Sequence, residues 1–181
     1  MNRYVCLMLV LMTANPSLAN TIAFDDGELG YWRVVNDTVM GGRSESRFYL
    51  QDGIGVFEGY LSLANSGGFA SVRRYASPQF YSDGTVTINV KGDGRKYQLR
   101  LSTPALYRGM AYVAEFQTTK NTWQQINFNQ SDFTVRYRGR LINGAPALDF
   151  ANVQRLGILL ADKNAGKFKL QIKSVEGFNA I

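Results

Sequence analysis

The segment TVTINVKGDGRKYQLRL, residues 85–101, contains two runs in which apolar and polar side chains alternate. The first run, 85–91, has valine or isoleucine at every second position, and the second, 96–101, has tyrosine or leucine there. A period of two places one face of a β-strand against a core and the other in water. The Gly92–Arg95 stretch between them favours a tight turn, so the segment predicts a β-hairpin.

The same period recurs on both sides of this segment, whereas no helix-length stretch has sustained apolar spacing of three and four. The pairs Asp52-Gly53, Asp83-Gly84 and Asn143-Gly144 favour further turns. About ten short strands predict an all-β fold, an antiparallel β-sandwich or jelly roll. The continuously apolar run from Leu156 to Ala161 predicts a strand covered on both faces. The side chains expected inside are Phe57, Leu61, Val86, Ile88, Leu99, Leu101, Phe116, Leu159, Phe168, Leu170 and Ile172.

The first 19 residues have the pattern of a signal peptide. A positive start at Arg3 precedes an apolar run over residues 4–12, and small residues stand at Ser17 and Ala19. The run is too short for a stable membrane span. We therefore expect cleavage after Ala19, export to the periplasm or the extracellular space, and a single β-sandwich domain over residues 20–181 with no transmembrane segment.

The composition excludes several kinds of catalysis. The chain has no histidine, and its one cysteine, Cys6, lies in the predicted signal peptide. A histidine-dependent triad, a histidine-ligated zinc site and a cysteine nucleophile are therefore excluded. We expect a non-enzyme without a cofactor, with a carboxylate-based hydrolase as the remaining catalytic alternative. The net charge of +6 favours anionic lipid, anionic polysaccharide or an acidic protein surface as a partner, while export argues against nucleic acid.

The stretch NDTVMGGRS, residues 36–44, is the sharpest candidate site because it combines an amide, a carboxylate, glycines and a hydroxyl in one loop. Glycines allow a partner to approach the backbone closely. The alternative is a structural loop in which the Asn and Asp side chains cap backbone groups. The candidate binding residues of this loop are Asn36, Asp37, Met40, Gly41, Gly42 and Ser44.

Further candidates lie downstream. Ser71 and Arg73 share one strand face, and Arg73 suits either a carboxylate or sugar hydroxyl ligand or an internal pair with Asp37 or Asp93. We expect the 36–44 loop, Arg73 and Asp93 to lie near one another at one end of the sandwich. The remaining binding candidates are Arg95, Arg138 and Arg140.

For the other charged clusters, a purely structural role is the alternative to a binding role. The basic stretch 136–140 suits an anionic partner or a solvated strand face, and the lysines of 167–173 suit an edge strand protected from aggregation. Asp25, Asp26 and Glu28 offer oxygen ligands for calcium, although their spacing has no specific pattern.

Seven blocks in order resemble one known family. The blocks, following Trp32, are NDTVMGGRS (36–44), GVFEG (55–59), GGFASVR (67–73), KGDGRKY (91–97), RGR (138–140), LGILLADK (156–163) and GKF (166–168). Their order is similar to that of the complex I intermediate-associated protein 30 family, over about residues 24–178.

This resemblance implies a galactose-binding-like jelly roll. It also implies a role like that of the mitochondrial members, which assist assembly of respiratory NADH:ubiquinone oxidoreductase and are not known as enzymes. The expectation is a protein-interaction or assembly factor for a membrane-associated complex, here as an exported bacterial member. Export would separate the chain from the cytoplasmic arm of bacterial complex I.

The alternative function is a carbohydrate-binding module of the cell envelope. Such modules display exposed aromatic side chains as a stacking platform for sugar rings. The residues that decide between the two functions are Trp32, Tyr107, Tyr112 and Trp123.

Overall fold

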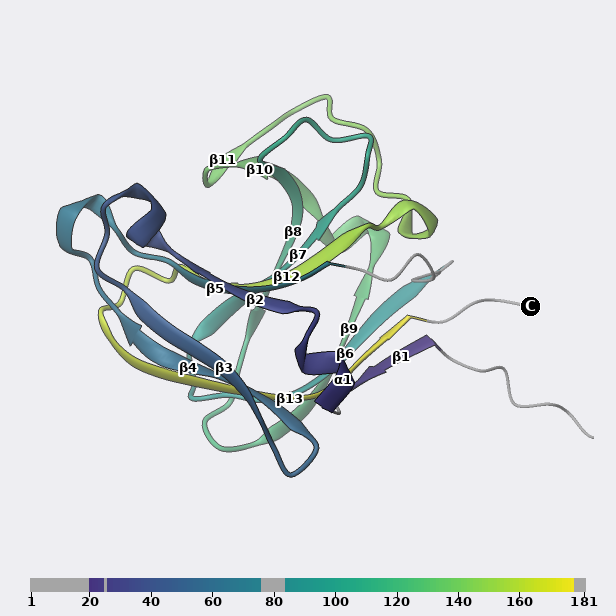
Figure 1. The fold of residues 1–181 in the computed structure, drawn as a ribbon. Helices are drawn as coiled ribbons and strands as arrows, with labels where there is room; N and C mark the ends of the chain where they lie inside the picture. The colour runs from purple at the N-terminus through teal and green to yellow at the C-terminus, as the bar shows by residue number, and fades with distance from the viewer. Residues whose placement is uncertain (1–19, 25, 76–83, 178–181) are drawn as a thin grey trace, which may run out of the picture.

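Two antiparallel β-sheets pack face to face in the computed structural model, which describes residues 20–24, 26–75 and 84–177 (Figure 1). The predicted signal peptide, residues 1–19, lies outside the described residues. Sheet A has the order β3 (Glu45–Gln51), β4 (Ile54–Leu61), β13 (Gly166–Gly177), β6 (Thr85–Lys91) and β9 (Trp123–Asn129), with β1 (Asn20–Ala23) also paired to β13. Sheet B has the order β11 (Arg140–Leu141), β10 (Thr134–Tyr137), β8 (Met110–Gln117), β7 (Lys96–Ser102), β12 (Arg155–Leu160), β5 (Ala70–Tyr75) and β2 (Trp32–Asn36). The predicted antiparallel sandwich is confirmed.

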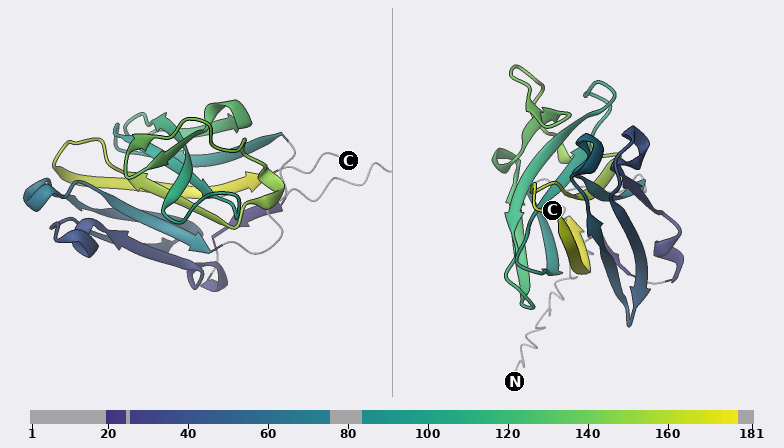
Figure 2. Two further views of the ribbon diagram at one scale, coloured as in Figure 1. Left: turned by 90° about the horizontal axis from the view of Figure 1, so that it is seen from above. Right: turned by 90° about the vertical axis from the view of Figure 1, so that its left-hand side faces the viewer.

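Short helical turns connect the strands. They are α1 (Asp26–Leu29) and the 3₁₀ turns η1 (Asp37–Met40), η2 (Ala64–Ser66), η3 (Gln130–Asp132) and η4 (Phe150–Asn152). Figure 2 shows η1 and η2 at the same end of the sandwich, where an Asn65 amide donates to the Gly41 carbonyl at 3.2 Å.

The core lies between the sheets and is built from alternate residues of the strands, as the period of two predicts. All eleven side chains expected inside are buried. Leu159 differs from the other ten because its side chain points away from the core. It pairs in register with Gln98 and Ser71, lies on the outer face of sheet B, and is 8% exposed. The β12 strand is therefore covered on both faces at this point, in agreement with its continuously apolar sequence.

The turn over residues 92–95 is not a hairpin, which corrects the prediction from the sequence. Strand β6 pairs with β13 and β9 in sheet A, whereas β7 pairs with β12 and β8 in sheet B. The chain therefore crosses from one sheet to the other at Gly92–Arg95. At Gly92 a Cβ atom would lie 2.4 Å from the Thr118 side chain, so glycine permits the tight crossing.

The lysine-rich strand β13 does not lie at an edge, which corrects a second expectation. It pairs with β4 on one side and with β6 on the other. Its lysines project from the outer face of sheet A because alternate positions, Phe168, Leu170 and Ile172, fill the core.

Candidate functional site

Asp37, at the start of η1, holds two loops together. Its carboxylate accepts hydrogen bonds from the Ser44 backbone at 2.8 Å, the Ser44 hydroxyl at 2.6 Å, and the backbone N–H groups of Gly68 at 2.6 Å and Phe69 at 3.2 Å. The side chain is buried, with 1% exposed. Burial alone would raise the pKa of Asp37, but the hydrogen bonds from Gly68, Ser44 and Phe69 hold this pKa below its ordinary value.

Two glycines of the family blocks make this carboxylate accessible to its donors. A Cβ atom at Gly42 would lie 2.3 Å from Asp37 Cγ, and one at Gly67 would lie 2.6 Å from Asp37 Oδ2. Gly41 has a φ of 89°, the left-handed conformation that ends η1. The 36–44 and 67–69 segments therefore form a structural latch centred on Asp37, which is the alternative that the sequence left open for this loop.

The latch exposes an apolar loop tip, defined here as Val39, Met40 and Leu63. Val39 is 70% and Met40 65% exposed, and Leu63 is exposed as well. Asn36 is engaged within the protein, since its side-chain oxygen accepts from the Ser46 hydroxyl at 2.6 Å. Of the candidates in this loop, Met40 is thus the side chain most available to a partner.

Asp93 and Arg95 form internal contacts between the sheets. Asp93 accepts from the Lys169 backbone at 2.9 Å and from the Tyr97 hydroxyl at 3.1 Å, and these contacts, after burial, raise the pKa of Tyr97. Arg95 pairs with Asp162 at 2.6 Å and also donates to the Asn164 carbonyl. Asp93 lies beside β13 of sheet A, whereas Arg73 projects from the outer face of sheet B, so the two do not line one cavity.

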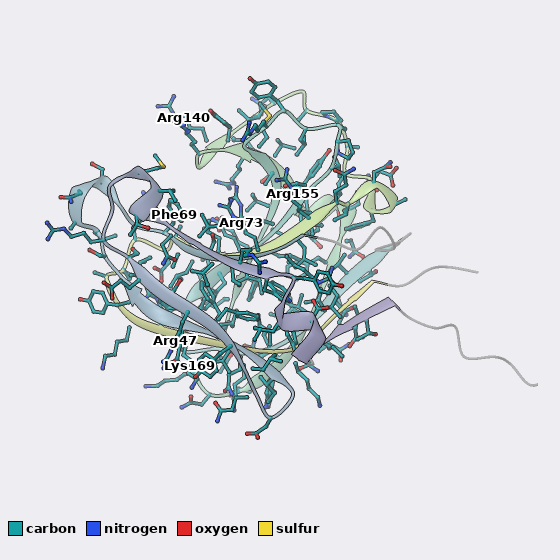
Figure 3. The ribbon with its side chains drawn as sticks, in the orientation of Figure 1. Arg47, Phe69, Arg73, Arg140, Arg155 and Lys169 are labelled. Atoms are coloured by element: carbon teal, nitrogen blue, oxygen red, sulfur yellow. The ribbon has the colours of Figure 1, made fainter. Side chains whose placement is uncertain are left out.

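Arg73 belongs to a different cluster, which the sequence did not single out. The outer face of sheet B has a cavity of about 340 Å³, and the arginines that line it are Arg73, Arg100, Arg108 and Arg155. No acidic residue is among the described residues of its lining. Figure 3 shows Arg73 and Arg155 projecting on one side of sheet B, with Arg47 and Lys169 on the far side of the sandwich. We call the cavity lined by Arg73, Arg100, Arg108 and Arg155, with Ser71 and Ser102, the arginine cavity.

Gly157 lies at the centre of the arginine cavity. Gly157 pairs in register with Arg73 on one neighbouring strand and with Arg100 on the other. No side chain therefore fills the space between these two arginines on the outer face of sheet B. A Cβ atom there would lie 2.9 Å from the Val72 carbonyl oxygen. Glycine therefore lets β12 pack closely against β5 and leaves the floor of the cavity as bare backbone.

The electrostatics of the cavity are unbalanced. Burial lowers the pKa of Arg100 to about 10, with further contributions from the like charges of Arg73 and Arg136. A guanidinium keeps its proton at neutral pH, so this lowering represents a cost that the folded state carries. Arg136 Nε is buried without a hydrogen-bond partner among the described residues. Arg136 does not itself line the cavity, whose excess positive charge comes from its four arginines with no acidic residue among the described lining.

Of the remaining candidates, Ser71 lines the arginine cavity, whereas Arg138 and Arg140 do not. Ser71 is buried and donates to the Val35 carbonyl at 2.6 Å. Arg138 forms the tip of the β10–β11 turn with its guanidinium over the Tyr137 ring, and Arg140 is exposed on β11. Figure 3 shows Arg140 and Phe69 on opposite sides of the space into which Arg73 projects.

The acidic N-terminal cluster is engaged in structure where it is described. Glu28 pairs with Arg74 and accepts from the Trp32 indole at 2.9 Å. Asp25 lies outside the described residues, and within the described ranges there is no group of three or more acidic side chains placed to hold a metal ion.

The four aromatic residues that could form a stacking platform for carbohydrate lie in different parts of the structure. Trp32 and Tyr112 are buried in the core. Trp123 lies on β9 of sheet A under Lys91, and Tyr107 is exposed in the β7–β8 connection. No aromatic side chain is among the described residues that line the arginine cavity. In the described part of the chain, no helix is both long and apolar enough to cross a membrane.

Solved structures with the same fold include carbohydrate-binding modules. The family 11 carbohydrate-binding module of cellulase Lic26A-Cel5E of Clostridium thermocellum has a TM-score of 0.63 and 15% identity, and the match covers 92% of this chain and 99% of that one. The agarase AgWH50C has a TM-score of 0.56 and 8% identity, over 89% of this chain and 25% of that one. At these identities the likeness shows the fold alone.

Sequence relatives identify the family. A mouse protein, mitochondrial complex I intermediate-associated protein 30, is 26% identical over 173 residues, which is 83% of this chain and 53% of that protein. The chain thus spans about half the length of this curated relative. The model of the family described as complex I intermediate-associated protein 30 matches residues 22–172. The chain belongs to the complex I intermediate-associated protein 30 family.

Proposed function

We propose that this protein is a non-catalytic binding module that assists the assembly of a membrane-associated complex by holding a protein partner against the outer face of sheet B. The observation that carries the proposal is the arginine cavity, an unbalanced positive site on the face of a family member whose mouse relative is named for association with a complex I intermediate. Exposed Met and Arg side chains are enriched at protein interfaces.

The contacts of four described carboxylates support a non-catalytic role for these residues. Asp37, Asp93 and Asp162 hold loops and sheets together, and Glu28 holds Arg74. A general acid and base need accessible carboxyl groups across a shared cleft. The absence of histidine from the sequence removes the commonest alternative base.

A carbohydrate-binding function is the second candidate, because the arginine cavity also has donors suited to sugar hydroxyl groups. The dispersed aromatic residues count against it, since sugar rings bind by stacking on exposed aromatic faces. Calorimetric titration tests this candidate with three ligands: soluble mixed-linked glucan, agarose oligosaccharides and oligogalacturonate. A carbohydrate-binding module should release or absorb heat with at least one of them, whereas the assembly proposal expects no heat of binding.

Deletion of the gene tests the assembly proposal. Native electrophoresis of the membranes should then show less of one mature complex together with its partly assembled forms, and the wild-type gene should restore it. The mature complex should not contain this chain, because an assembly factor leaves the product. An unchanged pattern of membrane complexes would contradict the proposal. The proposed export is tested separately by the intact mass of the envelope protein, which should begin at Asn20.

A further inference from the structure

The two outer faces of the sandwich differ in how their charges are balanced. On sheet A, Glu58 accepts from Arg47 at 2.9 Å and lies 3.3 Å from Lys169, so both cations share a carboxylate. On sheet B, no described carboxylate forms an ion pair with Arg100, Arg108 or Arg155. The cations of the two faces therefore differ: Arg47 and Lys169 on sheet A share a carboxylate, whereas the cavity arginines Arg100, Arg108 and Arg155 have no described one.

The geometry of the arginine cavity suits a small, planar anion. Neighbouring strands lie about 4.8 Å apart, so the Cα atoms of Arg73 and Arg100 lie on the order of 10 Å apart across Gly157. A guanidinium binds a carboxylate through two parallel N–H donors. The cavity, about 340 Å³, accommodates a side chain rather than a folded surface.

The crowding of like charges indicates that the cavity is incomplete without a ligand. Arg100 is crowded by like charges, and the buried Arg136 Nε lacks an acceptor among the described residues. Clustered and unsatisfied cations reduce stability. Oxygen atoms of an anion bound in the cavity would accept from the guanidinium groups that line it and offset the repulsion.

We propose that the arginine cavity binds carboxylate side chains of an acidic segment on the protein partner. The inference rests on the proposed function, because it takes the partner to be a protein. An acidic polypeptide fits better than an acidic glycan, because no aromatic side chain is among the described residues of the cavity wall. Figure 3 also shows Phe69 on the same side of sheet B as Arg73, which gives an extended peptide a further apolar contact.

The test is fluorescence anisotropy of a labelled ten-residue oligoglutamate with the full chain. Wild type should bind, and added salt should weaken the binding. Arg100→Gln and Arg155→Gln should each weaken it about tenfold, the loss expected for a charge-assisted hydrogen bond. Arg47→Gln is the matched control, because it removes the same charge from the opposite face and leaves Glu58 with Lys169. Equal losses in all three variants would overturn the proposal.

Thermal melts separate a binding role from a structural one. In anion-free buffer Arg100→Gln should melt above wild type, because the variant removes one of several crowded like charges, and a fixed concentration of oligoglutamate should raise the melting temperature of wild type more than that of Arg100→Gln. A large drop in melting temperature would show that Arg100 is structural and would overturn the proposal. Arg155→Gln, at an exposed position, keeps the binding test valid if Arg100→Gln does not fold.

The outcomes distinguish this inference from the assembly role on which it rests. Binding of oligogalacturonate without binding of oligoglutamate would replace the protein partner by a glycan. Restoration of the membrane complex by Arg100→Gln in the deletion strain would overturn the inference and leave the assembly role intact. Oligoglutamate binding at the cavity with no assembly defect on deletion would leave the anion site intact and refute the assembly role.

Discussion

At the scale of single residues, Asp37 explains why its loop has so many small and polar side chains. One carboxylate receives four hydrogen bonds, and the closest approaches around it require glycine at positions 42 and 67. Ser44 extends the network, because its hydroxyl also accepts from the Ser62 backbone at 3.0 Å. The most distinctive block of the family in this chain is thus a latch that positions the loop tip.

Replacing Asp37 with Asn should lower the free energy of unfolding by about 2–4 kcal/mol, because buried N–H donors lose a charged acceptor and meet an amide NH₂. The measurement is urea unfolding at pH 7. Asp52→Asn is the matched control at the exposed β3–β4 turn, where Asn tolerates the positive φ of 52°. A urea unfolding curve of Asp37→Asn equal to that of the control would contradict the latch.

At the scale of elements, the sequence predicts strands more reliably than their partners. Asp52-Gly53 is a two-residue hairpin turn with both φ angles positive, as its sequence favours. Gly92–Arg95 has similar turn residues between equally good strands, yet it crosses between the sheets. Alternation records only that a strand has one buried face, so it cannot distinguish a hairpin from a crossing.

The candidate site illustrates the same limit. The loop at residues 36–44 is recognisable from its residue types, but its structural role depends on donors from residues 68 and 69. The arginine cavity gathers side chains from β5, β7, β12 and the β7–β8 connection, and each of them occupies an ordinary polar position in its own segment. The available signal was Gly157 within an apolar strand, since an isolated strand glycine marks a close backbone approach.

The crossing between the sheets provides a prediction at this scale. Arg95, which directly precedes β7, donates to Asp162 and to the carbonyls of Gly166 and Lys167, the first residues of β13 in the other sheet. Burial alone would raise the pKa of Asp162, but Arg95 and Asn164 hold it below its ordinary value. Arg95→Gln should cost about 3 kcal/mol of stability, because it leaves a mostly buried carboxylate without its cation.

A double-mutant cycle of Arg95→Gln with Asp162→Asn measures the interaction of this pair, which we call the Arg95–Asp162 clamp. The double variant should lose less than the sum of the single variants, with a coupling of about 1–3 kcal/mol. Lys96 and Glu115, an exposed pair 3.7 Å apart on sheet B, provide the control cycle, whose coupling should stay below about 1 kcal/mol. Additive losses at Arg95 and Asp162 would show that the clamp does not connect the sheets.

At the scale of the whole molecule, one continuous core joins both sheets. Leu170 lies at the centre of β13, fully buried and paired with Phe57. Leu170→Ala should reduce the free energy of unfolding by about 2–5 kcal/mol, because the rigid sheets cannot close the cavity. Leu141→Ala, at an exposed position on β11, should change it by less than about 1 kcal/mol. A comparable effect of the two substitutions in chemical unfolding would contradict this core.

The pH dependence of stability follows from the titratable groups of the whole chain. Without histidine, no side chain with an ordinary pKa titrates between about pH 5.5 and 8, so the melting temperature should be nearly constant there. Asp37 and Asp162 have pKa values held below their ordinary 3.8, and Glu58, next to Arg47 and Lys169, has one held below 4.5.

These three carboxylates stabilise the fold while ionised. Because each pKa is lower in the folded state, their stabilisation is complete above the ordinary values and is lost as the pH falls through the folded ones. Differential scanning calorimetry should therefore show a level melting temperature from pH 8 to about 5.5 and a steep fall below about pH 4.5. Asp37→Asn should melt lower at pH 7 but lose less on acidification, because it lacks one titrating group. A steep change between pH 8 and 6, or an identical acid loss in the variant, would show that these carboxylates do not control acid stability.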